Sequence, residues 1–412
     1  MYGKTVLRER FFLFIFAEKD LWKMDKTRLE LAGALALNRI FGFEPKYSVR
    51  LIENLGSAAA VFSLSPDELR SIFGPCSKYS GSINTDALEK ADREIDYLKS
   101  IGAVFVPLTS PDFPQLLKEC EDAPAGLYVR STSTPAEIFN SRGKIAIVGT
   151  RDLSLYGKEW SERTVRAIAC SPSRPSIVSG LALGVDISAH MAALACKLPT
   201  IAVLPVGIDS VYPASHRTAA GKIAEFPGGA LVTDYPPGTP PSQLNFLRRN
   251  RIIAGMSSAT ILIESRLKGG GMMTARLAAG YGRTVLALPG RADDLRSQGC
   301  NQLLKEKVAE PLFPLTSLSA DLGLESFNMR RSHGIEDAVR AHYSGLADTQ
   351  TVTLLCRIAV EIKKNRGITP EGLSEAVALP YREAAAMVGM LESDGFVSTD
   401  LLQRCVINVR ND

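Results

Sequence analysis

The sequence lacks the features of a membrane-spanning or secreted protein. It contains no apolar run that approaches the roughly 20 residues needed to span a bilayer, and its seven cysteines are widely spaced without a C-x-x-C pair. Such cysteines are typical of reduced thiols in the cytoplasm. The apolar run at 11–16 is followed by Glu18 and has no small-residue cleavage site. Residues 1–25 are therefore interpreted as an N-terminal extension rather than a signal peptide.

The usual signatures of catalysis and of cofactor binding are also missing. Segment 149–157 follows an expected strand, but it carries neither the G-x-G-x-x-G of dinucleotide folds nor the G-x-x-x-x-G-K-[ST] of a P-loop. No G-x-S-x-G elbow, Cys/His nucleophile pair or H-E-x-x-H occurs. Asp186 and His190 share one helical face without a third metal ligand, which favours a turn residue and an oriented polar group. We expect no cofactor, no metal and no catalytic residue.

What the sequence does contain is a local concentration of positive charge. The 412 residues, of which 45% are hydrophobic, carry a net charge of only +4. Residues 240–310 hold eleven Lys and Arg against five Asp and Glu, an excess larger than that of the whole chain. A basic field of this kind is expected where phosphates bind, although a charged run more commonly marks a solvated face.

Short apolar runs rich in β-branched residues, each followed by glycine and a helical pattern, occupy the middle of the chain. They lie at 145–148, 176–178, 200–204, 230–232, 260–263 and 284–288. Buried strands that alternate with helices predict an α/β fold with a doubly wound, mostly parallel sheet. Ligands of such sheets bind beyond the carboxyl ends of the strands.

Helical patterns flank this central part, which we expect to span residues 86–312. Residues 26–85 predict a small helical domain of helix-hairpin-helix or SAM-like type, in which Ser65-Pro-Asp-Glu68 has the form of a helix start. Residues 313–350 are interpreted as a linker. Residues 351–412 predict three helices and two short strands, the order of a winged-helix-like domain.

Glycines and cations gather just after the expected strands. The blocks are 148–151, 179–186, 248–251 and 268–271. Arginine supplies planar donors that fit phosphate oxygens, and glycine lets backbone N–H groups approach them closely. Together the blocks predict a phosphate-binding surface without a nucleophile.

Five ordered motifs make the chain similar to the DNA-processing protein A (DprA, also called Smf) family. V-G-[ST]-R with S-x-Y-G matches 148–157, S-G-x-A-x-G-[IV]-D-x-x-A-H matches 179–190, G-[IL]-D-x-[IV]-Y-P matches 207–213, N-F-x-x-R-N-R-I-I-A matches 245–254, and E-x-x-x-x-[SG]-G with T-A-R matches 264–276. The sequence departs from the family pattern at Leu183, where Arg is common, and at His216, Asp234, Leu247 and Gly270.

The resemblance implies a non-enzymatic cytoplasmic protein with an extended Rossmann-like domain. Such a protein would bind single-stranded DNA, form a homodimer and not associate with membranes. It would help to load RecA recombinase onto incoming DNA during natural transformation. By position, the resemblance assigns contact with DNA to Thr150, Arg151, Ser179, Gly180, Arg249, Asn250, Arg251, Lys268, Gly269, Gly271 and Thr274.

Two other functions stay open on the sequence. Phosphoribohydrolases with a related sheet carry P-G-G-x-G-T-x-x-E, whereas here Pro227-Gly-Gly229 is followed by Ala-Leu-Val-Thr-Asp234, without the next glycine and the glutamate. The C-terminal domain would also suit a sequence-specific regulator, which would bind duplex DNA without the central domain.

Overall fold

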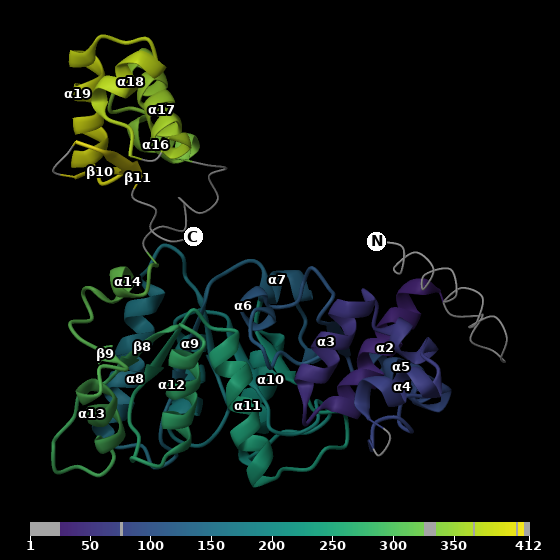
Figure 1. Cartoon of the computed structure of the whole chain (residues 1–412). Helices are drawn as coiled ribbons and strands as arrows, with labels where there is room; N and C mark the ends of the chain where they lie inside the picture. The colour runs from purple at the N-terminus through teal and green to yellow at the C-terminus, as the bar shows by residue number, and fades with distance from the viewer. Residues whose placement is uncertain (1–24, 75–76, 325–334, 366, 401–402, 408–412) are drawn as a thin grey trace. The chain divides into compact units, whose positions relative to one another are not determined.

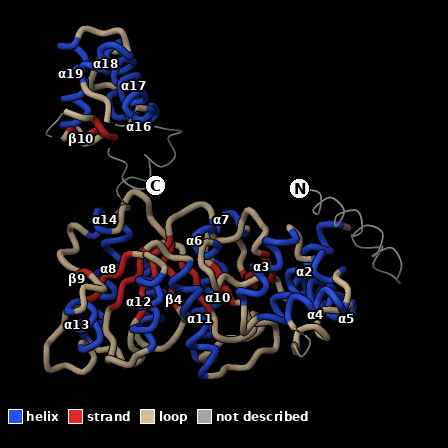
Figure 2. The backbone as a smooth tube through the Cα atoms, in the orientation of Figure 1, coloured by secondary structure: helices blue, strands red, loops and turns tan. Residues whose placement is uncertain are grey.

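A nine-stranded sheet forms the centre of the larger part of the chain (Figures 1 and 2). The computed structural model describes residues 25–74, 77–324, 335–365, 367–400 and 403–407. The expected N-terminal extension falls outside these residues, apart from Asp25, which caps the first described helix. The chain divides into two units between residues 324 and 325, and each unit is described by itself.

The sheet has the strand order β1-β2-β6-β5-β4-β3-β7-β8-β9. Its strands are β1 Ala103–Pro107, β2 Gly126–Arg130, β3 Lys144–Val148, β4 Ser176–Ser179, β5 Thr200–Val203, β6 Ala230–Thr233, β7 Ala259–Leu262, β8 Thr284–Ala287 and β9 Glu310–Pro311. The six predicted strands are β3 to β8, and every pairing among them is parallel, which confirms the predicted α/β fold. β1 and β2 add an antiparallel edge.

The direction of strand addition reverses between β3 and β7. From β3 the chain adds β4, β5 and β6 on one side, and then returns to add β7, β8 and β9 on the other. At such a switch point the connections diverge to opposite faces of the sheet, which leaves a crevice beyond the carboxyl ends of the two central strands.

Helices cover both faces of the sheet, as Figure 2 shows. They are α8 Leu155–Ala169, α9 Val185–Ala195, α10 Arg217–Glu225, α11 Gln243–Gly255, α12 Gly270–Gly280 and α13 Gln298–Lys305, with the short helices α6 Gln115–Lys118, α7 Pro135–Phe139, η3 Ala214–His216 and α14 Leu318–Asp321. Side chains alternate between the faces along a strand. In β3, Ile145 and Ile147 pack with α8 and α9, whereas Ala146 and Val148 pack with α11 and α12. A strand covered on both faces needs the continuous apolar run seen in the sequence.

The helices before the sheet share a core with it. They are α2 Lys26–Phe41, α3 Pro45–Leu55, the 3-10 helix η2 Ala59–Ser63, α4 Pro66–Phe73 and α5 Thr85–Ser100. Ser65 and Glu68 form the expected capping box of α4. Leu35 of α2 belongs to the same buried cluster as Tyr128 of β2 and Leu204 after β5. The helices expected as a domain over 26–85 therefore lie in one unit with the sheet.

The second unit contains helices and a two-stranded hairpin. Its elements are α16 Ile335–Tyr343, α17 Thr349–Lys364, α18 Pro370–Ala376, α19 Tyr381–Ser393, β10 Val397–Thr399 and β11 Cys405–Ile407. α16 falls in the segment interpreted as a linker, yet Val339 and Tyr343 are part of the core, and the Tyr343 hydroxyl donates to the carbonyl of Met390 (3.0 Å). The winged-helix-like assignment stays a prediction. No helix among the described residues of either unit is long and apolar enough to cross a membrane.

Candidate nucleic-acid interface

A cavity of about 760 Å³ lies at the switch point of the sheet. Its walls come from the loop after β3, the loop before α9, one side of α11 and the glycine-rich loop between β7 and α12. We call it the glycine-loop pocket. It brings together eight of the sequence-predicted residues, which are Thr150, Arg151, Arg249, Asn250, Lys268, Gly269, Gly271 and Thr274.

The loop after β3 is fixed by a buried glutamate. The backbone N–H of Thr150 donates to the carbonyl of Glu264 (2.7 Å). The Glu264 carboxylate, only 1% exposed, accepts from the backbone N–H (3.0 Å) and the hydroxyl of Ser154. These bonds join the ends of β3 and β7, and they present Arg151 at the rim of the pocket, where it is exposed.

The glycine loop ends at the N-terminus of α12. Gly269 is the N-cap residue, and no side chain among the described residues accepts a hydrogen bond from the first turn. The first N–H groups of a helix have no partner within the helix and form the positive end of its dipole. A Cβ on Gly271 would lie 3.0 Å from the Cα of Gly149, so the absence of a side chain lets the two loops meet. This arrangement suits a phosphate group.

Two cations at the rim are not paired with a carboxylate of any described residue. Arg151 and Lys268 are exposed and form no ion pair with any described residue. By contrast, Arg266 and Arg296 both lie near the carboxylate of Asp152, at 3.8 and 3.3 Å. The positive charge available to a ligand therefore comes first from Arg151 and Lys268.

Arg249 forms part of the floor of the pocket. It is 3% exposed, and its Nη1 donates to the carbonyl of Val203 (2.8 Å). Burial lowers the pKa of Arg249 to about 10, so the group stays charged at neutral pH. Gly180 makes the space for this guanidinium, because a Cβ there would lie 1.5 Å from Nη1. Gly180 thus acts through Arg249 rather than by lining the pocket.

Ser179 and Arg251 are not brought into the pocket. Ser179 is buried, and its hydroxyl donates to the carbonyl of Ile147 (2.6 Å). Arg251 lies on another side of α11 and forms a buried ion pair with Asp234 (2.5 Å). In both cases the polar side chain is bonded within the fold. Neither residue lines the glycine-loop pocket, and their assignment to DNA contact stays a prediction.

Asp186 and His190 have the structural roles expected of them. Asp186 accepts from the backbone N–H groups of Gly180 (3.2 Å) and Ala182 (3.3 Å). Nδ1 of the fully buried His190 pairs with the hydroxyl of Thr200 (2.7 Å). Burial lowers the pKa of His190 to about 3, so the ring is neutral. No group of three potential metal ligands occurs among the described residues.

An aromatic pair in the pocket was missed by sequence reasoning. The guanidinium of Arg151 lies 4.7 Å from the centre of the Phe246 ring, and that ring meets Tyr212 edge to face at 5.2 Å. Tyr212 is 39% exposed. Both residues stood in motifs that we recognised, but their chemistry was not used. Phe246 is half-buried, so the exposed Tyr212 ring beside these cations offers the surface on which a base can stack.

Comparison with known proteins shows the family to which this chain is similar. A family model described as DNA recombination-mediator protein A matches residues 104–322, which include the whole glycine-loop pocket. The chain belongs to this family. Protein Smf of Escherichia coli is 33% identical over 299 residues, covering 71% of this chain and 74% of that protein. DNA processing protein DprA of Bacillus subtilis is 33% identical over 217 residues, covering 53% and 71%.

A solved structure is similar as well. The X-ray structure of DprA from Streptococcus pneumoniae superposes with a TM-score of 0.57 at 26% identity, and the match covers 71% of this chain and 95% of that chain. The recombination-mediator family thus shares the sheet that carries the pocket.

Proposed function

We propose that this chain binds single-stranded DNA in the glycine-loop pocket and acts as a non-enzymatic recombination mediator. One observation carries the proposal: cations without an ion-pair partner among the described residues, an open helix N-terminus, the exposed Tyr212 ring and the half-buried Phe246 ring line the same crevice. The cations and the helix suit phosphates. The Phe246 and Tyr212 rings suit unpaired bases, which a duplex does not offer.

The position of the Pro227-Gly-Gly229 segment speaks against the phosphoribohydrolase alternative. These residues precede β6, so they lie at the amino ends of the parallel strands, on the opposite edge of the sheet from the pocket. Asp186 is the only carboxylate among the described lining residues of the pocket, and it already accepts two backbone hydrogen bonds. Incubation with nucleoside monophosphates should release no free base.

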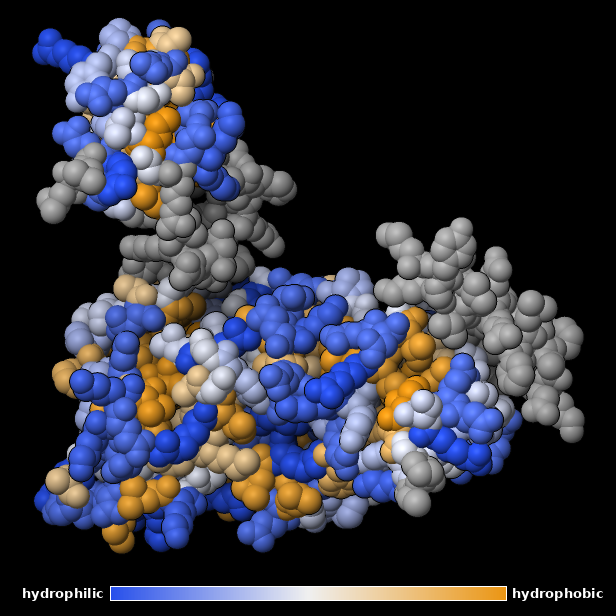
Figure 3. All heavy atoms as spheres, viewed as in Figure 1, coloured by the Kyte–Doolittle hydropathy of each residue, from blue (hydrophilic) through white to orange (hydrophobic). Residues whose placement is uncertain are grey.

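We further propose that the chain works as a homodimer in the cytoplasm and helps to load RecA onto the bound strand during transformation. Membership of the recombination-mediator family supports this. Exposed apolar side chains beside the pocket, Leu244 at 53% and Leu267 at 51%, support a protein partner there. Figure 3 shows apolar side chains at the end of α11. Light scattering should give the mass of a dimer. RecA should assemble faster on single-stranded DNA when this protein is present than when it is absent.

Fluorescence anisotropy with labelled oligonucleotides tests the central proposal. Single-stranded DNA should bind more tightly than duplex of the same length, with little dependence on sequence and a strong dependence on salt. Equal or tighter binding of duplex would contradict the proposal, and would favour a regulator that reads duplex through the C-terminal unit.

A further inference from the structure

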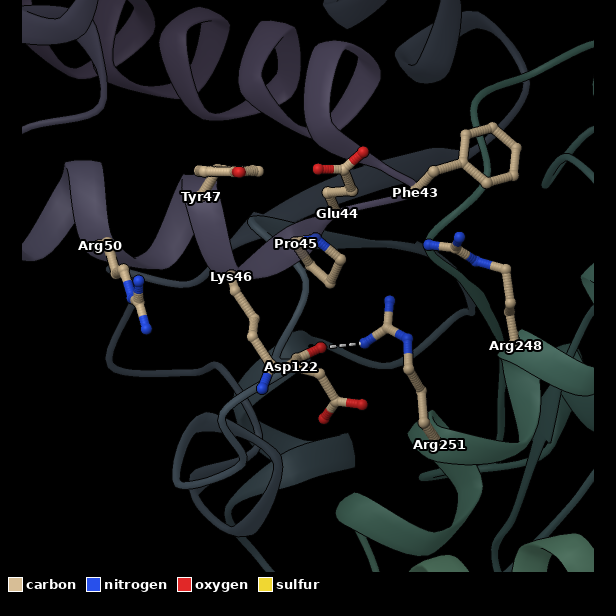
Figure 4. A pocket seen from close by; sticks show the side chains of 9 residues that line it. All are labelled: Phe43, Glu44, Pro45, Lys46, Tyr47, Arg50, Asp122, Arg248 and Arg251. Carbon is tan, nitrogen blue, oxygen red and sulfur yellow. Dashed lines mark hydrogen bonds between the residues drawn. The ribbon is translucent and has the colours of Figure 1, made fainter. Parts of the chain in front are cut away.

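A second cavity, of about 470 Å³, lies between α3 and α11 (Figure 4). We call it the Phe43 pocket. Its lining residues are Phe43, Glu44, Pro45, Lys46, Tyr47 and Arg50 from the N-terminal helices, Asp122 from the loop before β2, and Arg248 and Arg251 from α11. It shares no lining residue with the glycine-loop pocket.

Positive charge in the Phe43 pocket is only partly neutralised. Neither Arg50 nor Arg248 forms an ion pair with a described residue, and Arg50 is exposed. The acidic groups are matched locally. Glu44 lies 3.4 Å from Lys78, and hydrogen bonding to Tyr79 together with Lys78 lowers the pKa of Glu44.

The remaining charged groups of the pocket already have partners. Asp122 accepts from the hydroxyl of Tyr281 (2.9 Å). Lys46 pairs with Glu121 (2.7 Å), and Arg251 pairs with the buried Asp234. Arg50 and Arg248 are therefore the cations of the pocket without an ion-pair partner among the described residues, and Arg248 also donates to the carbonyl of Gly42. This excess of positive charge favours an anionic ligand.

Two aromatic rings are presented beside these arginines. Phe43 is 60% exposed, and the guanidinium of Arg248 lies 4.4 Å from the centre of its ring. Figure 4 shows Arg248 pointing toward Phe43. Tyr47 is 40% exposed, while its ring is held in place by Phe41, Phe73 and Tyr79. The Tyr47 and Phe43 rings can stack with a base, and the guanidinium groups of Arg50 and Arg248 can bind a phosphate. Together they have the chemistry of a nucleotide site.

α11 connects this pocket to the first one. Phe246, Arg249 and Asn250 line the glycine-loop pocket, whereas Arg248 and Arg251 line the Phe43 pocket. The two cavities therefore flank a single helix, and an α-helix with its side chains is only about 10–12 Å across. One flexible strand can reach both.

We propose that the Phe43 pocket binds a further nucleotide of the same single strand, with the base against Phe43 and Tyr47 and the phosphate at Arg50 and Arg248. This inference rests on the proposed binding of single-stranded DNA in the glycine-loop pocket. It assigns the N-terminal helices a direct part in binding, and it makes the length of the strand a determinant of affinity.

A series of oligothymidylates of increasing length tests the inference in the full-length protein. Wild-type affinity should rise with length, and rise again once the strand reaches the Phe43 pocket. Phe43→Ala and Arg50→Ala should lose that second rise, which leaves the longest strand at least about fivefold weaker and the shortest strand unaffected. Lys268→Ala should weaken every length. Arg70→Ala is the matched control, because Arg70 is an exposed arginine of α4 outside both pockets.

Phe43→Trp keeps an aromatic ring in the Phe43 pocket and reports by its fluorescence whether DNA occupies the pocket. Its emission, corrected for that of the wild-type chain with its two tryptophans, should be quenched by long strands and not by short ones. Thermal melting of each variant checks the fold. Unchanged long-strand affinity in Phe43→Ala and Arg50→Ala, or no quenching of Phe43→Trp, would overturn the inference and leave the glycine-loop pocket intact. A wild-type protein that binds no single strand of any length would overturn the proposed function itself.

Discussion

Arg249 occupies the space that a side chain at Gly180 would need. A Cβ built on Gly180 would lie 1.5 Å from Nη1 of Arg249, the atom that donates to the carbonyl of Val203. The absence of a side chain at Gly180 thus leaves room for the buried guanidinium of Arg249, which lies on α11, far along the chain. This explains how a glycine outside the pocket can still determine the shape of its floor.

Gly180→Ala should therefore damage both stability and binding. The new methyl group must displace the Arg249 guanidinium, and such overpacking typically costs about 1–3 kcal/mol. Urea denaturation should show the loss, and anisotropy should show weaker binding of single strands. Gly221→Ala is the control. The site is within α10, and apart from the adjacent residues and the backbone of that helix no described atom lies within 4 Å of a Cβ there. This variant should be neutral or stabilising by up to about 1 kcal/mol. Equal stability of the two variants would refute the packing argument.

Arg151→Ala and Lys268→Ala should weaken binding of single strands without altering the melting temperature. Each variant removes an exposed cation without an ion pair among the described residues. A lost charge-assisted contact with phosphate corresponds to about tenfold or more in affinity. The slope of log affinity against log salt should become shallower by about 0.7 for each lost phosphate contact.

Arg166→Ala is the matched control for this pair. Arg166 is an exposed arginine of α8 that pairs with Glu162 (3.0 Å), and it lies outside the glycine-loop pocket. Its removal should leave affinity and salt slope unchanged. If it weakened binding as much as Lys268→Ala does, the effect would be one of overall charge rather than of the pocket.

The central sheet was predictable because its strands are buried on both faces. Such strands need continuous β-branched runs, which stand out in a sequence. The sequence did not predict the antiparallel edge of the sheet. β1 pairs with β2, and β2 joins the sheet by pairing with β6, a strand distant from it in the sequence. α16 was interpreted as linker because its core contacts, through Val339 and Tyr343, are made with helices that follow it.

The candidate site was predictable to the extent that its residues follow strand ends. Thr150, Arg151 and Lys268 do so, and they line the pocket. Helical periodicity places Arg251 and Arg249 on different faces, because positions two apart on a helix differ by about 200° in direction. Only the packing of α11 decides that Arg249 is the one that faces the pocket. Tyr212 and Phe246 meet only in the folded chain.

Arg251→Ala should act on stability rather than through the glycine-loop pocket. It leaves the buried carboxylate of Asp234 without its ion-pair partner, a change that typically costs about 3–5 kcal/mol. Replacing both residues with apolar side chains, as Arg251→Met with Asp234→Leu, should recover much of the loss. The shortest strand bound by the wild type should bind this double variant equally well. Weak binding by a stably folded double variant would restore Arg251 as a contact for DNA.

His190 should make the protein sensitive to mild acid. Burial lowers the pKa of His190 to about 3, whereas a histidine in an unfolded chain has a pKa near 6.5. Between these values the unfolded state binds a proton that the folded state does not, so the free energy of unfolding falls as the pH drops through this range. The expected slope from this residue approaches about 1.4 kcal/mol per pH unit.

Urea denaturation of the wild type and of His190→Asn between pH 7 and pH 5, where most carboxylates remain ionised, should show this pH dependence in the wild type and its loss in the variant. Parallel curves for the two proteins would mean that His190 takes up a proton in the folded state, contrary to its burial against Thr200.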